Sequence, residues 1–435
     1  MMRRFDSFRE MLAAQGRDNI AFGYFEGDAR KQLTYGEVLE RIDAYPLPAE
    51  DVIGVFCDNS IISVITIFAL AGKKQLALLN PADEPRILDA EIRAAHVSKL
   101  IGQGPEEYEA PPLAPGSVST ADILFFTSGT TSQNKAVVLD QQRLCSAAFN
   151  GGSLLPLTEE TGLLSVLPHS HVFGFVCSLL WPLSFGAKVL LGRGLKRIFM
   201  DFSEYRPTAV CLVPEMASFL ASRKLFNPEL KLILIGAGPC SDRTLELIRE
   251  MGIRVSYGYG LTESSSGIAL SLGEDPRAMT VCPDYRVTIE SDGEISVTCD
   301  TTLMKGYYED EAATREVLHG NKLLTGDLGR LEDGKLFITG RKKEILVLSD
   351  GTKVFLPEYE GRLRGILGPE SDFAVIQLQN GALALAVAKP EKAEGAVDFF
   401  NAGYPRGQRI SKIIYVDELP KTATGKIRRY EISDN

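Results

Sequence analysis

The sequence predicts an α/β protein with a large N-terminal domain and a small α+β C-terminal domain. Three observations lead to this prediction. Apolar runs of strand length alternate with helical stretches up to about Tyr285, which is typical of mostly parallel sheets covered by helices. Short apolar runs separated by Asp-Gly turns follow, as in an antiparallel unit. Beyond the basic segment Arg341–Glu344 the chain continues as a compact tail with strands of its own.

The N-terminal part of the chain alternates helices and strands. Thr34, with Glu37 three residues later, has the spacing of a capping box and predicts that a helix begins there. The predicted elements are, in order, a helix over Leu33–Ile42, a strand over Val52–Phe56, a helix over Ile61–Ala71, a strand over Leu76–Leu79, a helix over Glu84–His96 and a strand over Lys99–Ile101. A proline-rich loop over Pro111–Gly116 separates this part from the next.

The same alternation resumes after the loop and then gives way to short strands. The predicted elements are strands over Leu163–Leu167, Ala187–Leu191, Ala209–Val213 and Leu232–Ile235, a helix over Arg243–Met251, an antiparallel unit over about 285–340 with strands over Val287–Ile289, Ile295–Thr298, Gly329–Leu331 and Leu336–Thr339, and tail strands over Phe373–Gln377 and Ala382–Val387. We expect the two domains to span residues 1–342 and 343–435, with the boundary at Lys343.

Composition and charge exclude several classes of protein. The chain has 435 residues, of which 45% are apolar and 24% charged, values typical of a globular protein that needs no disulfide or metal for stability. The net charge of −10 argues against a general nucleic-acid binder and against an anionic membrane surface as the main partner. Seven scattered cysteines without a CxxC pair favour a reducing compartment, and no apolar run is long enough to span a bilayer. We therefore expect a soluble cytoplasmic protein.

A loop rich in hydroxyl side chains follows an apolar run at Ile123–Phe126. The loop runs Thr127-Ser128-Gly129-Thr130-Thr131-Ser132-Gln133-Asn134-Lys135. Hydroxyl and backbone N–H donors suit phosphate oxygens, and the lysine adds a positive charge. The spacing is not that of a Walker loop. An ordinary Ser/Thr-rich turn would have a similar composition, but the preceding strand and the lysine favour phosphate binding.

Two further segments carry groups suited to a nucleotide. In Tyr257–Glu263, paired glycines would let a flat ligand approach the backbone and a tyrosine could stack on a base, while Thr262 and Glu263 could reach a phosphate and its Mg²⁺. Asp327 could accept hydrogen bonds from ribose hydroxyls, with Arg341 following in the sequence. Taken singly, each of these segments is more often an ordinary turn.

The last two segments contain lysine and histidine. Leu419–Arg429 is a loop that presents Lys426, although a basic tail by itself is more often a solvated terminus. His169 and His171 would lie on one face if their segment is extended. Zinc binding is disfavoured because no third ligand is close in sequence, so we expect the histidines to line a pocket.

Together these segments resemble the acyl-adenylate-forming superfamily, which includes acyl-CoA synthetases such as fatty-acid–CoA ligases, the adenylation domains of peptide synthetases and firefly luciferases. Seven motifs occur in the family's order: Thr127–Lys135, Leu167–Gly174, Gly236–Pro239, Tyr259–Glu263, Gly326–Asp327, Gly340–Glu344 and Pro420–Lys426. The resemblance covers the chain from about Leu33 to its end. It implies a large multi-sheet N-terminal domain of the adenylate-forming type and a small mobile C-terminal domain.

The resemblance implies ATP, Mg²⁺ and CoA, or the phosphopantetheine of a carrier protein, as cofactors. Among the matching residues, Thr127, Ser128, Gly129, Thr130, Thr131 and Lys135 would hold the phosphates, and Gly236, Ala237, Gly238, Gly258, Tyr259 and Gly260 would enclose adenine. Thr262 would touch phosphate, Glu263 would bind Mg²⁺, and Asp327 and Arg341 would hold ribose. His171 would be a catalytic residue in the pocket wall, and Lys426 would bridge the carboxylate and the α-phosphate. Lys343 would be the hinge of the small domain, and Gly351 would face the pantetheine channel.

The resemblance also implies a reaction and a class of substrate. A carboxylic acid would be joined to AMP and then transferred to CoA. Amino-acid-activating members have an aspartate just after the position of His171, where this chain has Val172. The apolar segment His171–Val176 therefore favours a fatty or aryl acid. The main alternative is an acyl-AMP ligase that loads an acyl carrier protein, and the second is a catalytically silent acyl- or nucleotide-binding protein.

The chain departs from the family pattern mainly in the phosphate loop. Ser132, Asn134 and Ala136 stand where the family has glycine, proline and glycine, and Tyr257 stands where glutamine or asparagine is common. The chain is also short for the family, with a trimmed tail, which affects the expectation of CoA binding more than that of adenylation. The sequence predicts no oligomeric state.

Overall fold

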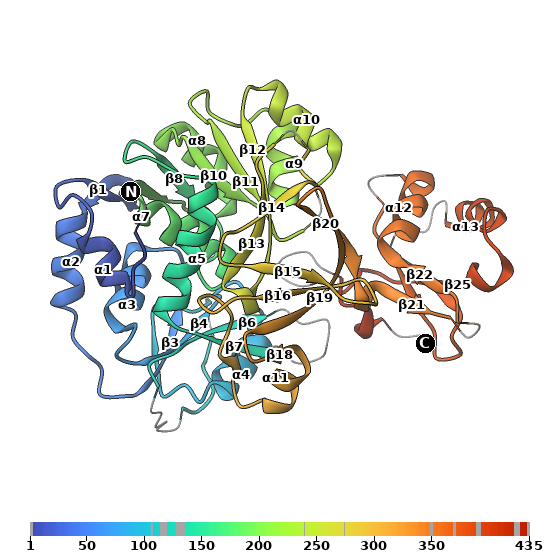
Figure 1. Ribbon diagram of the computed structural model, residues 1–435, viewed down its shortest axis with the longest axis horizontal. Coiled ribbons are helices and arrows are strands. Elements are labelled where there is room, and N and C mark those ends of the chain that lie inside the picture. The colour runs from blue at the N-terminus through green and yellow to red at the C-terminus, as the bar shows by residue number, and fades with distance from the viewer. Residues whose placement is uncertain are drawn as a thin grey trace.

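The computed structural model of the chain has a large lobe and a small one (Figure 1). It describes residues 3–105, 108–113, 120–127, 135–238, 240–273, 275–348, 351–368, 371–388, 393–421 and 427–432. The large lobe contains the elements coloured from blue through yellow to golden orange, up to β20, and the small lobe, at the right of Figure 1, contains the deeper orange and red elements at the C-terminal end. No helix in the described ranges is long and apolar enough to cross a membrane.

The larger of two sheets in the large lobe has fourteen strands among the described residues, in the order β15-β16-β19-β20-β14-β13-β12-β11-β10-β8-β9-β1-β2, with β18 paired to β19. Their bounds are β1 Ile20–Glu26, β2 Ala29–Thr34, β8 Gly162–Ser165, β9 Lys188–Leu191, β10 Ala209–Leu212, β11 Leu232–Ile235, β12 Arg254–Leu261, β13 Ser266–Ser271, β14 Met279–Val281, β15 Arg286–Ile289, β16 Glu294–Thr298, β18 Leu318–His319, β19 Lys322–Glu332 and β20 Lys335–Arg341.

Strand β12 joins two regions of this sheet that differ in direction. Its first half pairs in parallel with β11, and its second half, from Gly258, pairs antiparallel with β13. The two strands approach closely at Gly260, where a Cβ atom would lie 1.7 Å from the carbonyl oxygen of Ser266. Only glycine allows so close an approach of two backbones. The close approach of β12 and β13 therefore depends on Gly260. It places the residues around Tyr259 at the junction of the two regions of the sheet.

The second sheet has the strand order β17-β7-β6-β4-β3-β5. Its strands are β3 Val52–Phe56, β4 Gln75–Leu79, β5 Lys99–Ile101, β6 Ile123–Thr127, β7 Lys135–Leu139 and β17 Gly306–Tyr307. Strands β3, β4, β5 and β6 run in parallel, as expected from the alternation of helices and strands. Strand β7 runs antiparallel to β6, so that Thr127 lies opposite Lys135 where the hydroxyl-rich loop leaves and re-enters the sheet.

Helices cover both sheets of the large lobe (Figure 1). They are α1 Phe8–Ala13, α2 Tyr35–Asp43, α3 Ile61–Leu70, α4 Pro85–Ala94, α5 Gln141–Leu154, α6 Val172–Phe175, a π-helix over Val176–Leu180, α7 Trp181–Ser184, α8 Ile198–Tyr205, α9 Pro214–Ser222, α10 Asp242–Glu250 and α11 Glu311–Val317. Helix α3 is apolar on every side and exposes only Ile62, which is the pattern of a helix buried in a core.

An aromatic cluster in the core connects the second sheet to α6. The ring centroids of Phe125 in β6 and Phe175 in α6 lie 5.6 Å apart in an edge-to-face arrangement, and Phe8 packs on Phe175 at 5.7 Å. Such pairs are favourable beyond the area that they bury. The cluster fixes the end of β6, which carries Thr127, relative to the segment that begins at His171.

The small lobe has its own core. It contains β21 Ile345–Val347, β22 Lys353–Phe355, α12 Leu356–Leu367, β23 Phe373–Gln377, β24 Leu383–Val387, α13 Ala393–Ala402 and β25 Ile410–Tyr415, with β23, β24 and β25 in one sheet. Two clusters of buried residues belong to this lobe alone. At the junction of the lobes, the ring of Phe355 lies against Gly340, where a Cβ atom would meet it at 2.0 Å.

The α/β class and the division into parallel and antiparallel regions are confirmed. The strands over Val52–Phe56, Lys99–Ile101, Leu232–Ile235 and Phe373–Gln377 have the predicted bounds. Two local predictions were wrong. Leu33 pairs with Phe22 in the β1–β2 hairpin instead of opening α2, which starts after the capping residue Thr34. The strands of the antiparallel unit are also longer than predicted, because β19 and β20 continue to Asp327 and Arg341. The domain boundary at Lys343 stays a prediction.

Candidate active site

Asp327, Arg341 and Tyr259 form a compact polar cluster. Asp327 and Arg341 are direct partners across β19 and β20, and Nε of Arg341 lies 2.7 Å from Oδ1 of Asp327. The hydroxyl of Tyr259 donates to the other carboxylate oxygen, Oδ2, at 2.8 Å. Asp327 is 2% exposed, whereas 44% of the Arg341 side chain is accessible. The cluster thus contains a buried carboxylate and a guanidinium that solvent reaches.

The turn before Asp327 explains how the chain delivers this carboxylate. Gly326 has φ of +72°, a conformation that favours glycine. Its N–H donates to Oε1 of Glu294 at 2.8 Å, and the N–H of Asp327 donates to Oγ1 of Thr325 at 3.1 Å. Burial raises the pKa of Asp327 above its ordinary value, although Arg341 and Tyr259 act in the opposite direction. The carboxylate is therefore held in a position that opposes its ionisation.

Glu263 lies close to this cluster, at the end of β12. Its negative charge is one of the causes that raise the pKa of Asp327. Oε1 of Glu263 accepts a hydrogen bond of 2.7 Å from the hydroxyl of Tyr307. Nζ of Lys135 lies 4.4 Å from the centroid of the same tyrosine ring. Two residues that the motifs singled out, Glu263 and Lys135, are thus brought together by Tyr307, which sequence analysis did not single out.

Tyr307 was missed because its partners are distant in the sequence. The hydroxyl bond to Glu263 crosses 44 residues. The available signal was local, a Lys305-Gly306-Tyr307 sequence with a glycine at a point where the chain turns. Gly306 has φ of +151°, and a Cβ atom there would lie 3.0 Å from the side chain of Thr314. The glycine before Tyr307 therefore indicated a turn at this point of the chain. Only the long-range contact with Glu263 shows that the tyrosine belongs to the cluster.

The segment predicted to enclose adenine lies beside the histidine segment. Gly236 is buried against the ring of Phe173, whose Cζ would lie 3.0 Å from a Cβ atom at that position. Ala237 is exposed and has φ of +69°. The hydroxyl of Tyr257 donates to the carbonyl oxygen of Gly238. The Gly236–Gly238 turn is therefore held from one side by Phe173 and from β12 by Tyr257.

The segment around the two histidines is not extended, so the condition for placing both on one face is not met. Residues 168–170 form a turn, and His171 is the residue that precedes α6. His169 is fully buried and its Nε2 lies 2.8 Å from Oγ of Ser165, while burial lowers its pKa to about 4. Burial also lowers the pKa of His171. The two histidines therefore occupy different environments, both of which favour the neutral form.

Several predicted site residues lie outside the described residues. These are Ser128, Gly129, Thr130, Thr131 and Lys426. Residues next to Lys426 are described: Ile427 pairs with Lys421, and the charge of Arg428 lowers the pKa of Asp83 in the large lobe, which burial raises to about 6. The charge of Arg428, two residues after Lys426, therefore acts on the loop after β4. Gly351, with φ of +81°, lies in the turn between β21 and β22.

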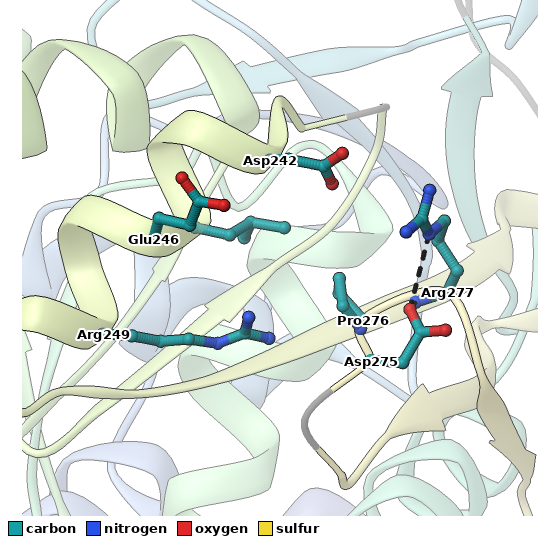
Figure 2. A pocket seen from close by; sticks show the side chains of 7 residues that line it. Asp242, Glu246, Arg249, Asp275, Pro276 and Arg277 are labelled. Atoms are coloured by element: carbon teal, nitrogen blue, oxygen red, sulfur yellow. Dashed lines mark hydrogen bonds and ion pairs between the residues drawn. The ribbon is translucent and has the colours of Figure 1, made fainter.

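A hollow is lined by side chains of α10 and of residues 275–277. Figure 2 shows side chains of both charges around it, with the salt bridge between Asp275 and Arg277 drawn as a dashed line. Its lining consists of Asp242, Leu245, Glu246, Arg249, Asp275, Pro276 and Arg277. None of these residues belongs to the predicted site, and no function is assigned to the hollow. Substitutions there can therefore serve as controls for variants of the site.

The protein is thus a two-lobed α/β protein with a cluster of charged side chains around the C-terminal half of β12. The chain belongs to the AMP-binding enzyme family, whose model matches residues 78–308, more than half of the chain. The observed fold is the adenylate-forming fold. It aligns over 100% of the chain with 99% of the O-succinylbenzoate coenzyme A synthetase MenE from Bacillus subtilis, in a structure with AMP, at a TM-score of 0.81 and 22% identity.

Curated relatives are also CoA ligases. The long-chain-fatty-acid–CoA ligase FadD13 of Mycobacterium tuberculosis is 28% identical over 70% of this chain, and the match spans 65% of that ligase's length. The 2-succinylbenzoate–CoA ligase of Bacillus subtilis strain 168 is 26% identical over 82% of this chain and 77% of its own length.

Proposed function

We propose that the protein is an AMP-forming acid–thiol ligase that acts on a hydrophobic carboxylic acid. In the first step, a carboxylate oxygen attacks the α-phosphorus of ATP, and the bond from that phosphorus to the leaving pyrophosphate breaks. In the second step, the thiol sulfur of CoA attacks the acyl carbon, AMP leaves and the thiol proton is released. The FadD13 and 2-succinylbenzoate ligase relatives, which are named for this type of product, support the proposal.

The observation that carries the proposal is the gathering of oppositely charged groups around the end of β12. Asp327 contacts Arg341 and Tyr259 there, and Tyr307 contacts both Glu263 and Lys135. A carboxylic acid is already ionised at neutral pH, so the first step needs no general base. It needs two anions to be brought together and their charge to be compensated in fixed positions. This arrangement suits such a reaction better than one that depends on an activated nucleophile of the protein.

The nucleotide would bind with its ribose at Asp327 and its adenine between the Gly236–Gly238 turn and Tyr259. Asp327 can accept hydrogen bonds from two hydroxyls, and Arg341 supplies a solvent-accessible guanidinium beside it. The triphosphate would extend toward Thr262 and Lys135. Lys426, which lies outside the described residues, would bridge the attacking carboxylate and the α-phosphate.

A single protein carboxylate is enough for the Mg²⁺ that accompanies ATP. No group of three or more His, Cys, Asp or Glu side chains in the described part of the chain could hold a metal alone. Mg²⁺ usually binds one or two carboxylates together with substrate phosphates and water. Glu263, whose Oε1 accepts the bond from Tyr307, would fit this donor set through its carboxylate. When bound, Mg²⁺ would compensate the negative charge of the phosphates.

The substrate class follows from the segment after His171. Val172 and Phe175 are buried, and Phe173 lies against Gly236. Cys177, in the π-helix, has its sulfur 3.4 Å from Oγ of Ser266. The partly buried Phe173 and Cys177 offer apolar surface and no carboxylate for an amino group, which supports a fatty or aryl acid.

The thiol acceptor is proposed to be CoA, with a carrier protein as the alternative. The CoA ligases among the relatives support CoA. The two acceptors share the phosphopantetheine thiol, so the same second step serves both. Offering CoA and a pantetheinylated carrier protein in parallel, after adenylation of the same acid, separates them: preferential thioester formation on the carrier protein would replace CoA in the proposal.

Pyrophosphate exchange into ATP tests the proposed first step directly. The purified protein is incubated with ATP, Mg²⁺, labelled pyrophosphate and one acid at a time from a panel of fatty, aryl and small polar acids. We expect exchange that depends on the acid and is fastest with hydrophobic acids. The Asp275→Asn variant, which changes a surface carboxylate paired with an arginine, should exchange like the unchanged protein. Absence of exchange with every acid would support a catalytically silent binding protein instead.

A further inference from the structure

Residues 304–307 are attached to Glu263 at two points. The N–H of Met304 donates to the backbone carbonyl oxygen of Glu263 at 2.8 Å. The hydroxyl of Tyr307 donates to the side-chain Oε1 of the same residue at 2.7 Å. Both the backbone and the carboxylate of Glu263 are therefore oriented by one short segment of chain.

That segment is itself firmly anchored to the hairpin that carries Lys135. Tyr307 pairs with Val137 in β7, and its N–H donates to Oγ1 of Thr314 at 2.9 Å. Nζ of Lys305 forms ion pairs with Asp122, just before β6, and Asp140, just after β7, at 2.5 and 3.3 Å. The strand pairing, the hydrogen bond to Thr314 and the two ion pairs thus set the position of the tyrosine ring before any ligand binds.

The ring of Tyr307 also faces Lys135. Nζ of Lys135 lies 4.4 Å from the ring centroid, within the range of a cation–π interaction. At its other end, the hydroxyl of Tyr307 donates to Oε1 of Glu263 at 2.7 Å. The phenol therefore holds an anion at its hydroxyl end and a cation at its ring face.

We propose that Tyr307 is a positioning residue that presents Glu263 to the Mg²⁺ of Mg·ATP and Lys135 to the phosphates. This inference rests on the proposed function and deepens it. With Oε1 occupied by the tyrosine hydroxyl, the carboxylate has one preferred orientation and offers Oε2 to a metal. Partners of this kind, which hydrogen-bond a ligating carboxylate, typically change metal affinity by about 10- to 100-fold.

The test measures nucleotide binding and not turnover. Without a carboxylic acid, ATP binds at equilibrium, and calorimetric titration at a series of Mg²⁺ concentrations gives the Mg²⁺ concentration for half-maximal affinity. In Tyr307→Phe, which keeps the ring over Lys135 but loses the hydroxyl, we expect that concentration to rise about tenfold while ATP affinity at saturating Mg²⁺ stays within about twofold. In Tyr307→Leu, which also loses the ring, ATP affinity should fall even at saturating Mg²⁺.

The matched control is Tyr308→Phe. Tyr308 is the next residue in the chain and packs toward His96, with ring centroids 6.3 Å apart, so its variant should keep the Mg²⁺ dependence of the unchanged protein. If Tyr307→Phe does not fold, Thr314→Val replaces it, because this variant removes the acceptor of the Tyr307 N–H and leaves the tyrosine intact. We then expect a smaller shift in the same direction.

The possible outcomes separate this inference from the proposed function. An unchanged Mg²⁺ dependence in Tyr307→Phe, or in Thr314→Val where that variant is used, would overturn the positioning role while Mg·ATP binding and pyrophosphate exchange by the unchanged protein persist. Failure of the unchanged protein to bind Mg·ATP would instead count against the proposed function.

Discussion

Asp327 and Arg341 face each other across two strands, with Nε of Arg341 2.7 Å from Oδ1 of a carboxylate that is 2% exposed. Although this pair is ionic, burial is the largest influence on Asp327 and raises its pKa. Since the folded state holds the proton more tightly than the unfolded state, ionisation of Asp327 opposes folding once the pH rises above its ordinary pKa. A carboxylate maintained at such a position is more readily explained by ligand binding than by stability.

The Asp327→Asn variant separates these two roles. The amide keeps an acceptor for Tyr259 and removes the buried charge, so we expect the free energy of unfolding at pH 7 to stay within about 1 kcal/mol of that of the unchanged protein. ATP affinity should fall at least about tenfold, because one charged acceptor for the ribose hydroxyls is lost. Urea unfolding and calorimetric ATP titration provide the two measurements. Unchanged ATP affinity would remove Asp327 from the site, and Asp275→Asn serves as the control.

Gly260 should tolerate no side chain. A Cβ atom there would lie 1.7 Å from the carbonyl oxygen of Ser266, so Gly260→Ala must separate β12 from β13. We expect a loss of more than about 3 kcal/mol in the free energy of unfolding, or failure to fold. The control is Gly151→Ala in α5, where the nearest atom lies 4.0 Å away. That variant should be stabilised by about 0.5–1 kcal/mol. Similar stabilities for the two variants would contradict the close approach of β12 and β13 at Gly260.

Buried His169 predicts a loss of stability in mild acid. Burial lowers its pKa from 6.5 to about 4, so below pH 6.5 the unfolded chain takes up a proton that the folded state does not accept until about pH 4. The stability that this difference contributes is complete above pH 6.5 and decreases as the pH falls, by about 2 kcal/mol at pH 5.

Urea unfolding at pH 7.5 and pH 5 measures this effect. The difference in unfolding free energy between the two pH values should be smaller in His169→Gln by about that amount. Equal pH dependence in both proteins would show that His169 becomes protonated in the folded state.

Lys426→Ala should affect only one half-reaction. The variant is expected to lose acyl-adenylate formation, because the attacking carboxylate and the α-phosphate lose their shared positive charge. It should still form the thioester from a supplied acyl-adenylate. The control is Lys421→Ala, whose lysine forms a 2.8 Å ion pair with Asp372 within the small lobe and which should retain both half-reactions. Equal loss of both steps in Lys426→Ala would assign that lysine a role in binding or folding.

Sequence patterns correctly predicted those helices and strands that are determined by neighbouring residues, such as a capping residue or an apolar run. Thr34 and Glu37 form the expected capping box, and apolar runs such as Leu232–Ile235 became buried strands with the predicted bounds. The β1–β2 hairpin was not predicted, because β2 lies at the sheet edge and exposes most of its residues. A strand of this kind lacks the alternation of apolar and polar residues on which strand prediction depends.

Long-range contacts explain the errors within the site. The turn at Pro168–Ser170 is held by Asn59, whose side chain donates to the carbonyl of Leu167 at 2.7 Å and accepts from the N–H of His169 at 3.0 Å. These bonds connect residues more than a hundred positions apart, so the segment between the histidines gave no local sign of the turn. The family motifs singled out Asp327, Arg341 and Glu263 as candidates, whereas Tyr307 became evident only from its contacts.

Transfer of ¹⁸O from the carboxylic acid is the most direct test of the central claim that a carboxylate oxygen attacks the α-phosphorus. An acid from the panel that supports exchange is labelled in both carboxylate oxygens and incubated with ATP, Mg²⁺, CoA and the protein, and the products are analysed by mass spectrometry. The account predicts one ¹⁸O atom in each AMP molecule and unlabelled pyrophosphate. Formation of ADP with the label in inorganic phosphate, or of AMP without label, would contradict it.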